Sequence, residues 1–173
     1  LGRVTPWLTA FEESQRMALE ADPTFRECAS IDGGKEGLKC ARSIALISYR
    51  CEDGYDRKQF EQDDDVFFAD RAGSYQRYQG LKLARRFDAY SYWYLAFSVD
   101  SGNVGRHRGG VAKALGSIKA KAVVASIDTD LIFPAYLMEE LAGMIPGAEY
   151  LQMTSHFGHD GFLLETEQLT EIF

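Results

Sequence analysis

Carboxylate and imidazole side chains that could act together in acid–base chemistry lie near the carboxyl end of the chain. Asp128 and Asp130 follow the apolar run 121–127, and His159 follows a second strand-like run, 149–154. A carboxylate that is bonded to an imidazole fixes its tautomer, and the imidazole can then take a proton from a nucleophile and return it. These residue types favour nucleophilic catalysis, with either Asp128 or Asp130 as the acid.

The segments around these residues predict a strand, a crossover helix and a second strand. The run 121–127 is apolar without alternation, which predicts a strand buried on both faces, and 134–143 begins with Pro and ends near Gly, as helices do. Such a unit is nearly always right-handed and parallel, so both following loops should emerge at one edge of the sheet. Gly158 and Gly161 would let the second loop turn sharply.

The order of Asp130 and His159, 29 residues apart, matches the last two members of a Ser-Asp-His triad in an α/β-hydrolase. A simpler alternative is that Asp130 ends a strand and His159 is an ordinary loop histidine. His156 and His159 could also be considered metal ligands, but no third ligand has convincing spacing, so we predict no metal site. Asp160 could cap the last helix.

Arg42 and Tyr49 are the further candidates for binding. They are seven residues apart in a predicted helix and therefore lie on nearly the same face, two turns from each other. Most arginines at such spacing belong to a solvated face. The alternative is that Arg42 binds an anionic group and Tyr49 donates a hydrogen bond.

Composition limits the possible partners. The net charge of −7 disfavours nucleic acid, and no apolar run approaches the roughly 20 residues that a membrane span needs. We find no signal peptide. Cys28, Cys40 and Cys51 are odd in number, so a disulfide framework or a thiolate metal site is not expected, and the cytoplasm is the simplest compartment.

The chain divides into a mainly helical part, 1–105, and an α/β segment, 106–173. The expected helices cover 6–21, 38–51, 74–86, 88–99 and 111–118, and the expected irregular connections cover 23–37 and 52–65. Two parallel strands cannot form a stable sheet alone. We therefore expect a helical cap inserted into a sheet protein, of which this chain is the carboxyl-terminal piece.

Several segments resemble the carboxyl-terminal part of the homoserine O-acetyltransferase family, and they occur in the family's order. They are Thr5 to Arg16, Ala41 to Arg50, Tyr78 to Gly80, Arg86 to Tyr92, Asp128 to Pro134 and Gly158 to Leu163. The resemblance implies an α/β-hydrolase fold and an acyltransferase of methionine biosynthesis. It also implies a homodimer formed through the helical cap.

The resemblance assigns roles to five residues. It implies that Asp130, rather than Asp128, is the triad acid, that His159 is the base, and that Arg42, Tyr49 and Asp160 contact homoserine. Acetyl-CoA would be the co-substrate, and no resident cofactor is implied. A serine would carry the acetyl group between the two substrates in a ping-pong reaction.

Two departures from the family pattern accompany the resemblance. The sequence contains no Gly-x-Ser-x-Gly, so the nucleophile is expected in a missing upstream half and the 173-residue piece alone should be inactive. Tyr90 stands where the family has Asn.

Other functions are also compatible with the sequence. The protein could use serine as acceptor or succinyl-CoA as donor, it could be a hydrolase of the same fold, or it could be a non-catalytic helical interaction module.

Overall fold

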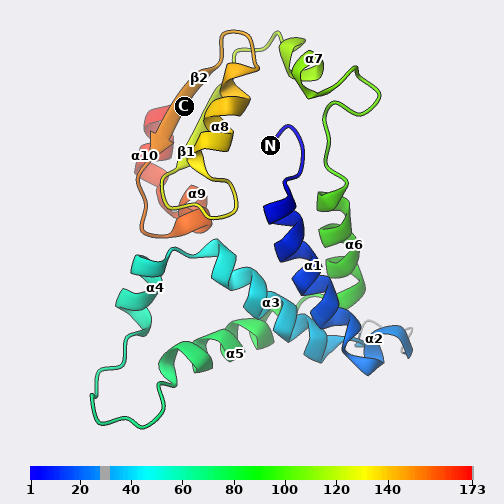
Figure 1. Ribbon diagram of the computed structural model, residues 1–173. Helices are drawn as coiled ribbons and strands as arrows, with labels where there is room; N and C mark the ends of the chain where they lie inside the picture. Colours follow the sequence, from blue (N-terminus) through cyan, green and yellow to red (C-terminus); the bar gives the residue numbers. More distant parts are fainter. Residues whose placement is uncertain (28–31, 173) are drawn as a thin grey trace. The chain divides into compact units, whose positions relative to one another are not determined.

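The computed structural model describes residues 1–27 and 32–172, so Cys28 lies outside the described residues. The chain forms two compact units (Figure 1). Unit 1 consists of Leu1–Thr5, Ser48–Gly54 and Ser101–Phe173, and unit 2 of Pro6–Ile47 and Tyr55–Asp100. The sequence-based division into a helical cap, 1–105, and an α/β segment, 106–173, is a separate statement about domains, and it stays a prediction.

Unit 1 contains the parallel sheet that the sequence predicts. β1 (Val123–Ile127) and β2 (Glu149–Met153) pair in parallel, with Ile127 opposite Met153 at their carboxyl ends. α8 (Ala135–Gly143) connects the strands and packs against both of them (Figure 1). The loops after β1 and β2 therefore leave the same edge of the sheet.

The prediction that the first strand is buried on both faces is wrong for this chain. Ser126 and Ile127 are buried, but Ala125 is exposed. The described sheet has two strands, so one long edge of β1 has no strand beside it. A largely apolar strand such as β1 is typical of a larger parallel sheet that is covered on both faces.

The rest of unit 1 is built from short helical segments. These are α7 (Val111–Gly116), the 3-10 helix η1 (Gly158–Asp160), α9 (Gly161–Leu164) and α10 (Thr166–Ile172). The N-terminal residues join this unit through a bridge between Arg3 and Asn103. η1 carries the candidate base, so its position matters most for function.

Helices dominate unit 2. They are α1 (Pro6–Glu20), α2 (Pro23–Glu27), α3 (Lys35–Tyr49), α4 (Glu52–Gln59), α5 (Arg71–Ala84) and α6 (Ala89–Asp100), of which α3 and α4 contribute one end each to unit 1. The irregular connections predicted at 23–37 and 52–65 are wrong where α2, the start of α3 and α4 occur. Both errors arose because Gly, Asp and charged residues suggested loops, whereas α4 places acidic residues in its first turn and basic residues in its last, which favours a helix.

The core of unit 2 is apolar and partly aromatic. Its buried members are Leu19, Phe25, Leu38, Ala41, Leu83, Ala84 and Ala89, and Phe87, Tyr90, Tyr92 and Trp93 pack against them. Tyr90 stacks on Phe25 with ring centroids 4.8 Å apart and donates a hydrogen bond to the Phe25 carbonyl. The tyrosine that departs from the family pattern thus has a packing role inside this unit.

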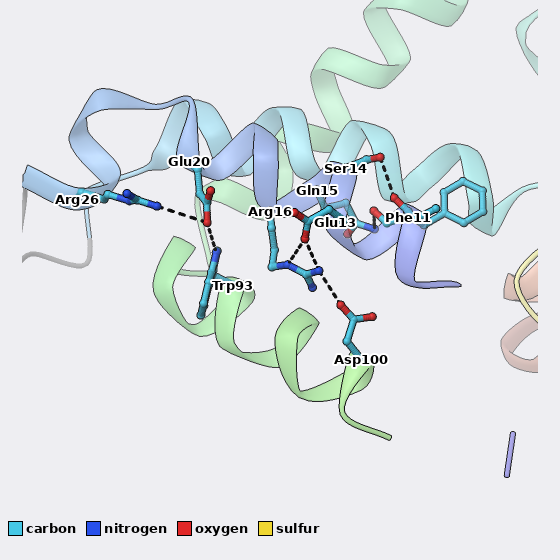
Figure 2. A network of polar contacts seen from close by, with 10 residues as sticks. Phe11, Glu13, Ser14, Gln15, Arg16, Glu20, Arg26, Trp93 and Asp100 are labelled. Atoms are coloured by element: carbon cyan, nitrogen blue, oxygen red, sulfur yellow. Dashed lines mark hydrogen bonds and ion pairs between the residues drawn. The ribbon is translucent and has the colours of Figure 1, made fainter. Parts of the chain in front are cut away.

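A buried arginine joins α1 to α6 within unit 2 (Figure 2). The guanidinium of Arg16 contacts Glu13 on its own helix and Asp100 on α6, with Nη2 2.6 Å from Oδ2 of Asp100. Trp93 of α6 donates a hydrogen bond of 3.1 Å to Glu20 of α1. A buried cation of this kind requires carboxylate partners, because desolvation otherwise makes it costly.

Candidate active site

Asp130 and His159 are hydrogen bonded to each other. Oδ2 of Asp130 lies 2.9 Å from Nδ1 of His159, and the Asp130 side chain is 6% exposed. Oδ1 of Asp130 accepts hydrogen bonds from the backbone N–H groups of Ile132 (2.7 Å) and Phe133 (2.9 Å). An ionised carboxylate can only accept, so Nδ1 donates and Nε2 is left to exchange protons.

Asp128 has a different task. Its Oδ1 accepts a hydrogen bond of 3.0 Å from the backbone N–H of Ser155, and the neighbouring Thr129 hydroxyl donates to the Ser155 carbonyl at 2.6 Å. Asp128 and Thr129 therefore connect the loop after β1 to the loop after β2. The residues alone left both Asp128 and Asp130 as possible triad acids. Their hydrogen-bond partners distinguish them, because Asp130 contacts the imidazole whereas Asp128 contacts the backbone of Ser155.

The imidazole of His159 sits among aromatic rings at the edge of a cavity. Its centroid lies 5.5 Å from that of Tyr49, 5.1 Å from Phe133 and 5.2 Å from Phe162. The cavity has a volume of about 400 Å³, and its wall includes Asp130 and His159 among mainly apolar side chains. Apolar surroundings strengthen the hydrogen bond between the carboxylate and the imidazole, because they lower the local dielectric constant.

Residues 155–160, here called the histidine loop, depend on glycine. Gly158 has a φ of +61°, and a Cβ atom there would lie 2.7 Å from the carbonyl carbon of Arg50 and from the backbone nitrogen of Cys51. Gly161 has helical dihedrals, with a φ of −54°. A Cβ there would come within 2.8 Å of Oγ of Ser155. Gly158 thus serves the turn, as predicted, whereas Gly161 serves close packing.

The segment Ser48–Gly54 lies against the histidine loop within unit 1, and we call it the α3-end segment. Nη1 of Arg50 forms an ion pair of 2.6 Å with Oδ2 of Asp160. The thiol of Cys51 donates to the carbonyl oxygen of His156 at 3.3 Å. Asp160 makes no side-chain capping bond to the helix that follows it, so the alternative in which it caps that helix is wrong.

The remaining candidate residues are placed as follows. Tyr49 lies beside His159, whereas Arg42 is half-buried on α3 within unit 2, and its proposed contact remains a prediction. His156 pairs with Asp53 at 3.0 Å through Nδ1. Among residues 1–27 and 32–172, no group of three His, Cys, Asp or Glu side chains could hold a metal ion.

Sequence reasoning missed Arg50, Phe133 and Phe162. Arg50 follows Tyr49 directly, but its partner Asp160 is 110 positions away, and no local pattern indicates such a pair. The two phenylalanines could have been found, because each lies three residues from a triad candidate. Residues three positions apart in a turn or a helix lie on the same side of the chain, so their side chains can line one site.

Sequence comparison relates this chain to known enzymes. No family model matches it. Homoserine O-acetyltransferase of Cyclobacterium marinum is 41% identical over 172 residues, which are 98% of this chain and 48% of that protein. The chain is a homologue of the homoserine O-acetyltransferases. It spans about half the length of the curated relatives it matches.

Solved structures agree with the sequence relationship. Homoserine O-acetyltransferase from Staphylococcus aureus superposes with a TM-score of 0.74 at 28% identity, over 96% of this chain and 45% of that one. The acetyl esterase MekB has a TM-score of 0.77 at 25% identity, over 99% of this chain and 49% of that one. The chain corresponds to part of an α/β-hydrolase fold, as predicted from the sequence.

None of the helices in the described part of the chain is both long and apolar enough to cross a bilayer.

Proposed function

We propose that the whole protein is a homoserine O-acetyltransferase that moves an acetyl group from acetyl-CoA to the hydroxyl of homoserine. The observation that carries the proposal is the hydrogen bond between Asp130 and His159, in a chain homologous to enzymes of that name. The geometry suits acyl transfer, because the buried acid orients the imidazole of His159, and this residue lines a cavity.

In the proposed first half-reaction, Nε2 of His159 takes the proton of a serine hydroxyl that lies outside these 173 residues. The serine oxygen attacks the thioester carbonyl, the C–S bond breaks, and the imidazolium returns the proton to the leaving CoA thiolate. The carboxylate of Asp130 stabilises the imidazolium that forms. Its two backbone hydrogen bonds, from Ile132 and Phe133, keep it in the orientation that this task needs.

In the proposed second half-reaction, His159 takes the proton of the homoserine hydroxyl. The hydroxyl oxygen attacks the acetyl-serine ester, and the serine leaves with the proton that the imidazolium returns. Homoserine is zwitterionic, so its recognition needs a cation and an anion. We assign its carboxylate to Arg42 with Tyr49, and its ammonium to Asp160.

A second candidate is an esterase that transfers the acetyl group to water. The likeness to the acetyl esterase MekB favours it, because the same acid and base serve either acceptor. A serine acceptor or a succinyl donor would also use this chemistry. Acetyl transfer to homoserine stands first because the sequence relatives carry that name.

Steady-state assays of the full-length protein separate these candidates. Acetyl-CoA and succinyl-CoA would be tested as donors, and homoserine, serine and water as acceptors, with release of the CoA thiol as the signal. We expect fast release that depends on acetyl-CoA and homoserine together. Release that does not depend on homoserine would favour the esterase, and preference for serine or succinyl-CoA would replace the proposed substrate.

Three further predictions belong to this proposal. The reaction needs no resident cofactor, since both substrates bring the reacting groups. The full protein forms a homodimer through its helical cap, and it works in the cytoplasm. Analytical ultracentrifugation of the full-length protein tests the dimer.

A further inference from the structure

The histidine loop and the α3-end segment touch at several points. Gly158 packs on the backbone of Arg50 and Cys51, and the Cys51 thiol bonds to the carbonyl of His156. A Cβ atom on Gly54 would lie 1.9 Å from that same carbonyl oxygen, so the two backbones approach closely. The loop that carries the candidate base is therefore held by residues about 100 positions earlier in the chain.

Arg50 adds the only ion pair to Asp160 that the described residues show. In this pair, Nη1 of Arg50 lies 2.6 Å from Oδ2 of Asp160. The side chains are 25% and 20% exposed, so both remain accessible from solvent. A carboxylate has about four lone-pair positions on two oxygens, so the contact with Arg50 does not use up the capacity of Asp160 to accept hydrogen bonds.

We propose that Arg50 is a positioning residue for the amino-acid acceptor. It holds Oδ2 of Asp160 so that Oδ1 faces the ammonium group of the substrate, and this inference rests on the proposed function. A carboxylate that is already fixed loses less rotational freedom when the ligand binds, which strengthens binding without a new contact to the ligand.

An electrostatic effect of Arg50 acts in the opposite direction. Arg50 carries a positive charge beside Asp160, and simple charge neutralisation would weaken the attraction of Asp160 for an ammonium. If positioning dominates, removal of Arg50 weakens homoserine binding. If neutralisation dominates, removal of Arg50 strengthens it.

The experiment measures KM for homoserine and for acetyl-CoA in full-length Arg50→Met, Arg50→Lys and Asp160→Asn proteins and in the Arg50→Met/Asp160→Asn double variant. We expect Arg50→Met to raise the homoserine KM by about tenfold, the scale of one hydrogen bond to a charged group, and the acetyl-CoA KM much less. Arg50→Lys should recover part of the loss, because the charge remains. The double variant should resemble Asp160→Asn, because Arg50 acts through that carboxylate.

Three results would contradict a positioning role for Arg50. A lower homoserine KM in Arg50→Met, equal increases for both substrates, or independent effects in the double variant would overturn the positioning role. The exposed Arg85 on the other unit provides the control, since Arg85→Met should leave both KM values within about twofold. If the unaltered protein does not acetylate homoserine, the proposed function fails, and that result is distinct from a failure of Arg50 alone.

Discussion

Nδ1 of His159 and Oδ2 of Asp130 lie 2.9 Å apart, and the carboxylate that makes this contact is held by two backbone N–H groups. Asp128, two residues earlier, instead accepts a hydrogen bond from the backbone of Ser155. The acid that orients the imidazole and the acid that joins the two loops are therefore different residues.

Substitution of the two acids should separate their roles. We expect Asp130→Asn to lower kcat of the full-length protein by about a thousandfold or more, because the amide no longer fixes the imidazole tautomer. Asp128→Asn is the matched control. It removes a negative charge at nearly the same place but leaves the imidazole contact intact, so its effect should be far smaller. Equal and small losses in both variants would contradict the assignment of Asp130.

Arg42→Ala should affect one substrate more than the other. If Arg42 binds the carboxylate of homoserine, its loss raises the homoserine KM by about tenfold or more, and the acetyl-CoA KM changes much less. Initial rates at varied concentrations of each substrate measure both values. An unchanged response to homoserine would place Arg42 outside the binding site.

The histidine loop should not tolerate a side chain at position 158. Gly158→Ala adds a Cβ atom at a φ of +61° and 2.7 Å from backbone atoms of the α3-end segment. Strain of this kind costs roughly 1 to 3 kcal/mol. We expect a lower melting temperature and a large loss of activity in the full-length protein.

Gly143→Ala is the control for Gly158→Ala. A Cβ atom at position 143 would have no neighbour within 4 Å, and the residue ends helix α8. Its melting temperature should stay close to that of the unaltered protein. Similar losses in the two variants would show that the close approach at Gly158 is not the cause.

The stability of unit 2 should depend on pH through Glu12. Burial raises the pKa of Glu12 from 4.5 to about 7, and the charge of Asp100 adds to the increase while Arg16 opposes it. Between these two pH values the folded protein retains a proton that the unfolded chain has lost, so stability falls as the pH rises from about 4.5 to about 7.

Glu12→Gln should remove this dependence. Urea unfolding of the full-length protein at several pH values gives the free energy of unfolding, and the advantage of the Gln variant should grow from pH 4.5 to pH 7. Glu140→Gln, at an exposed position on α8, is the control for loss of a carboxyl group, and this variant should retain the pH dependence that Glu12 causes. A Glu12→Gln curve parallel to that of the unaltered protein would contradict the expected titration.

Local patterns in the sequence predicted much of the fold. The strands, α8 and most long helices follow from apolar runs, Pro at helix starts and Gly at ends, and parallel pairing follows from the strand, helix and strand order. The short helices α2 and α4 were missed because their polar sequences resemble loops. Their helical state depends on packing and on charge placement, which simple periodicity does not report.

The site was predictable where a residue follows a strand, and unpredictable where a partner comes from far along the chain. Asp130 and His159 meet because both follow parallel strands. The choice of Asp130 over Asp128 from the residues alone was open, since it depends on which carboxylate the loop turns inward. The pair Arg50 and Asp160 depends on packing of the α3-end segment, which no spacing in the sequence encodes.

The most direct test of the central claim is to trap the acetylated protein. The full-length protein would be mixed with labelled acetyl-CoA, separated from free donor, and then exposed either to homoserine or to buffer. We predict one stable acetyl group on a serine, transferred rapidly to the hydroxyl of homoserine and lost only slowly in buffer, with no acetylation in the Asp130→Asn protein at the same times. Rapid loss of the acetyl group to water without transfer to homoserine would contradict the proposed function.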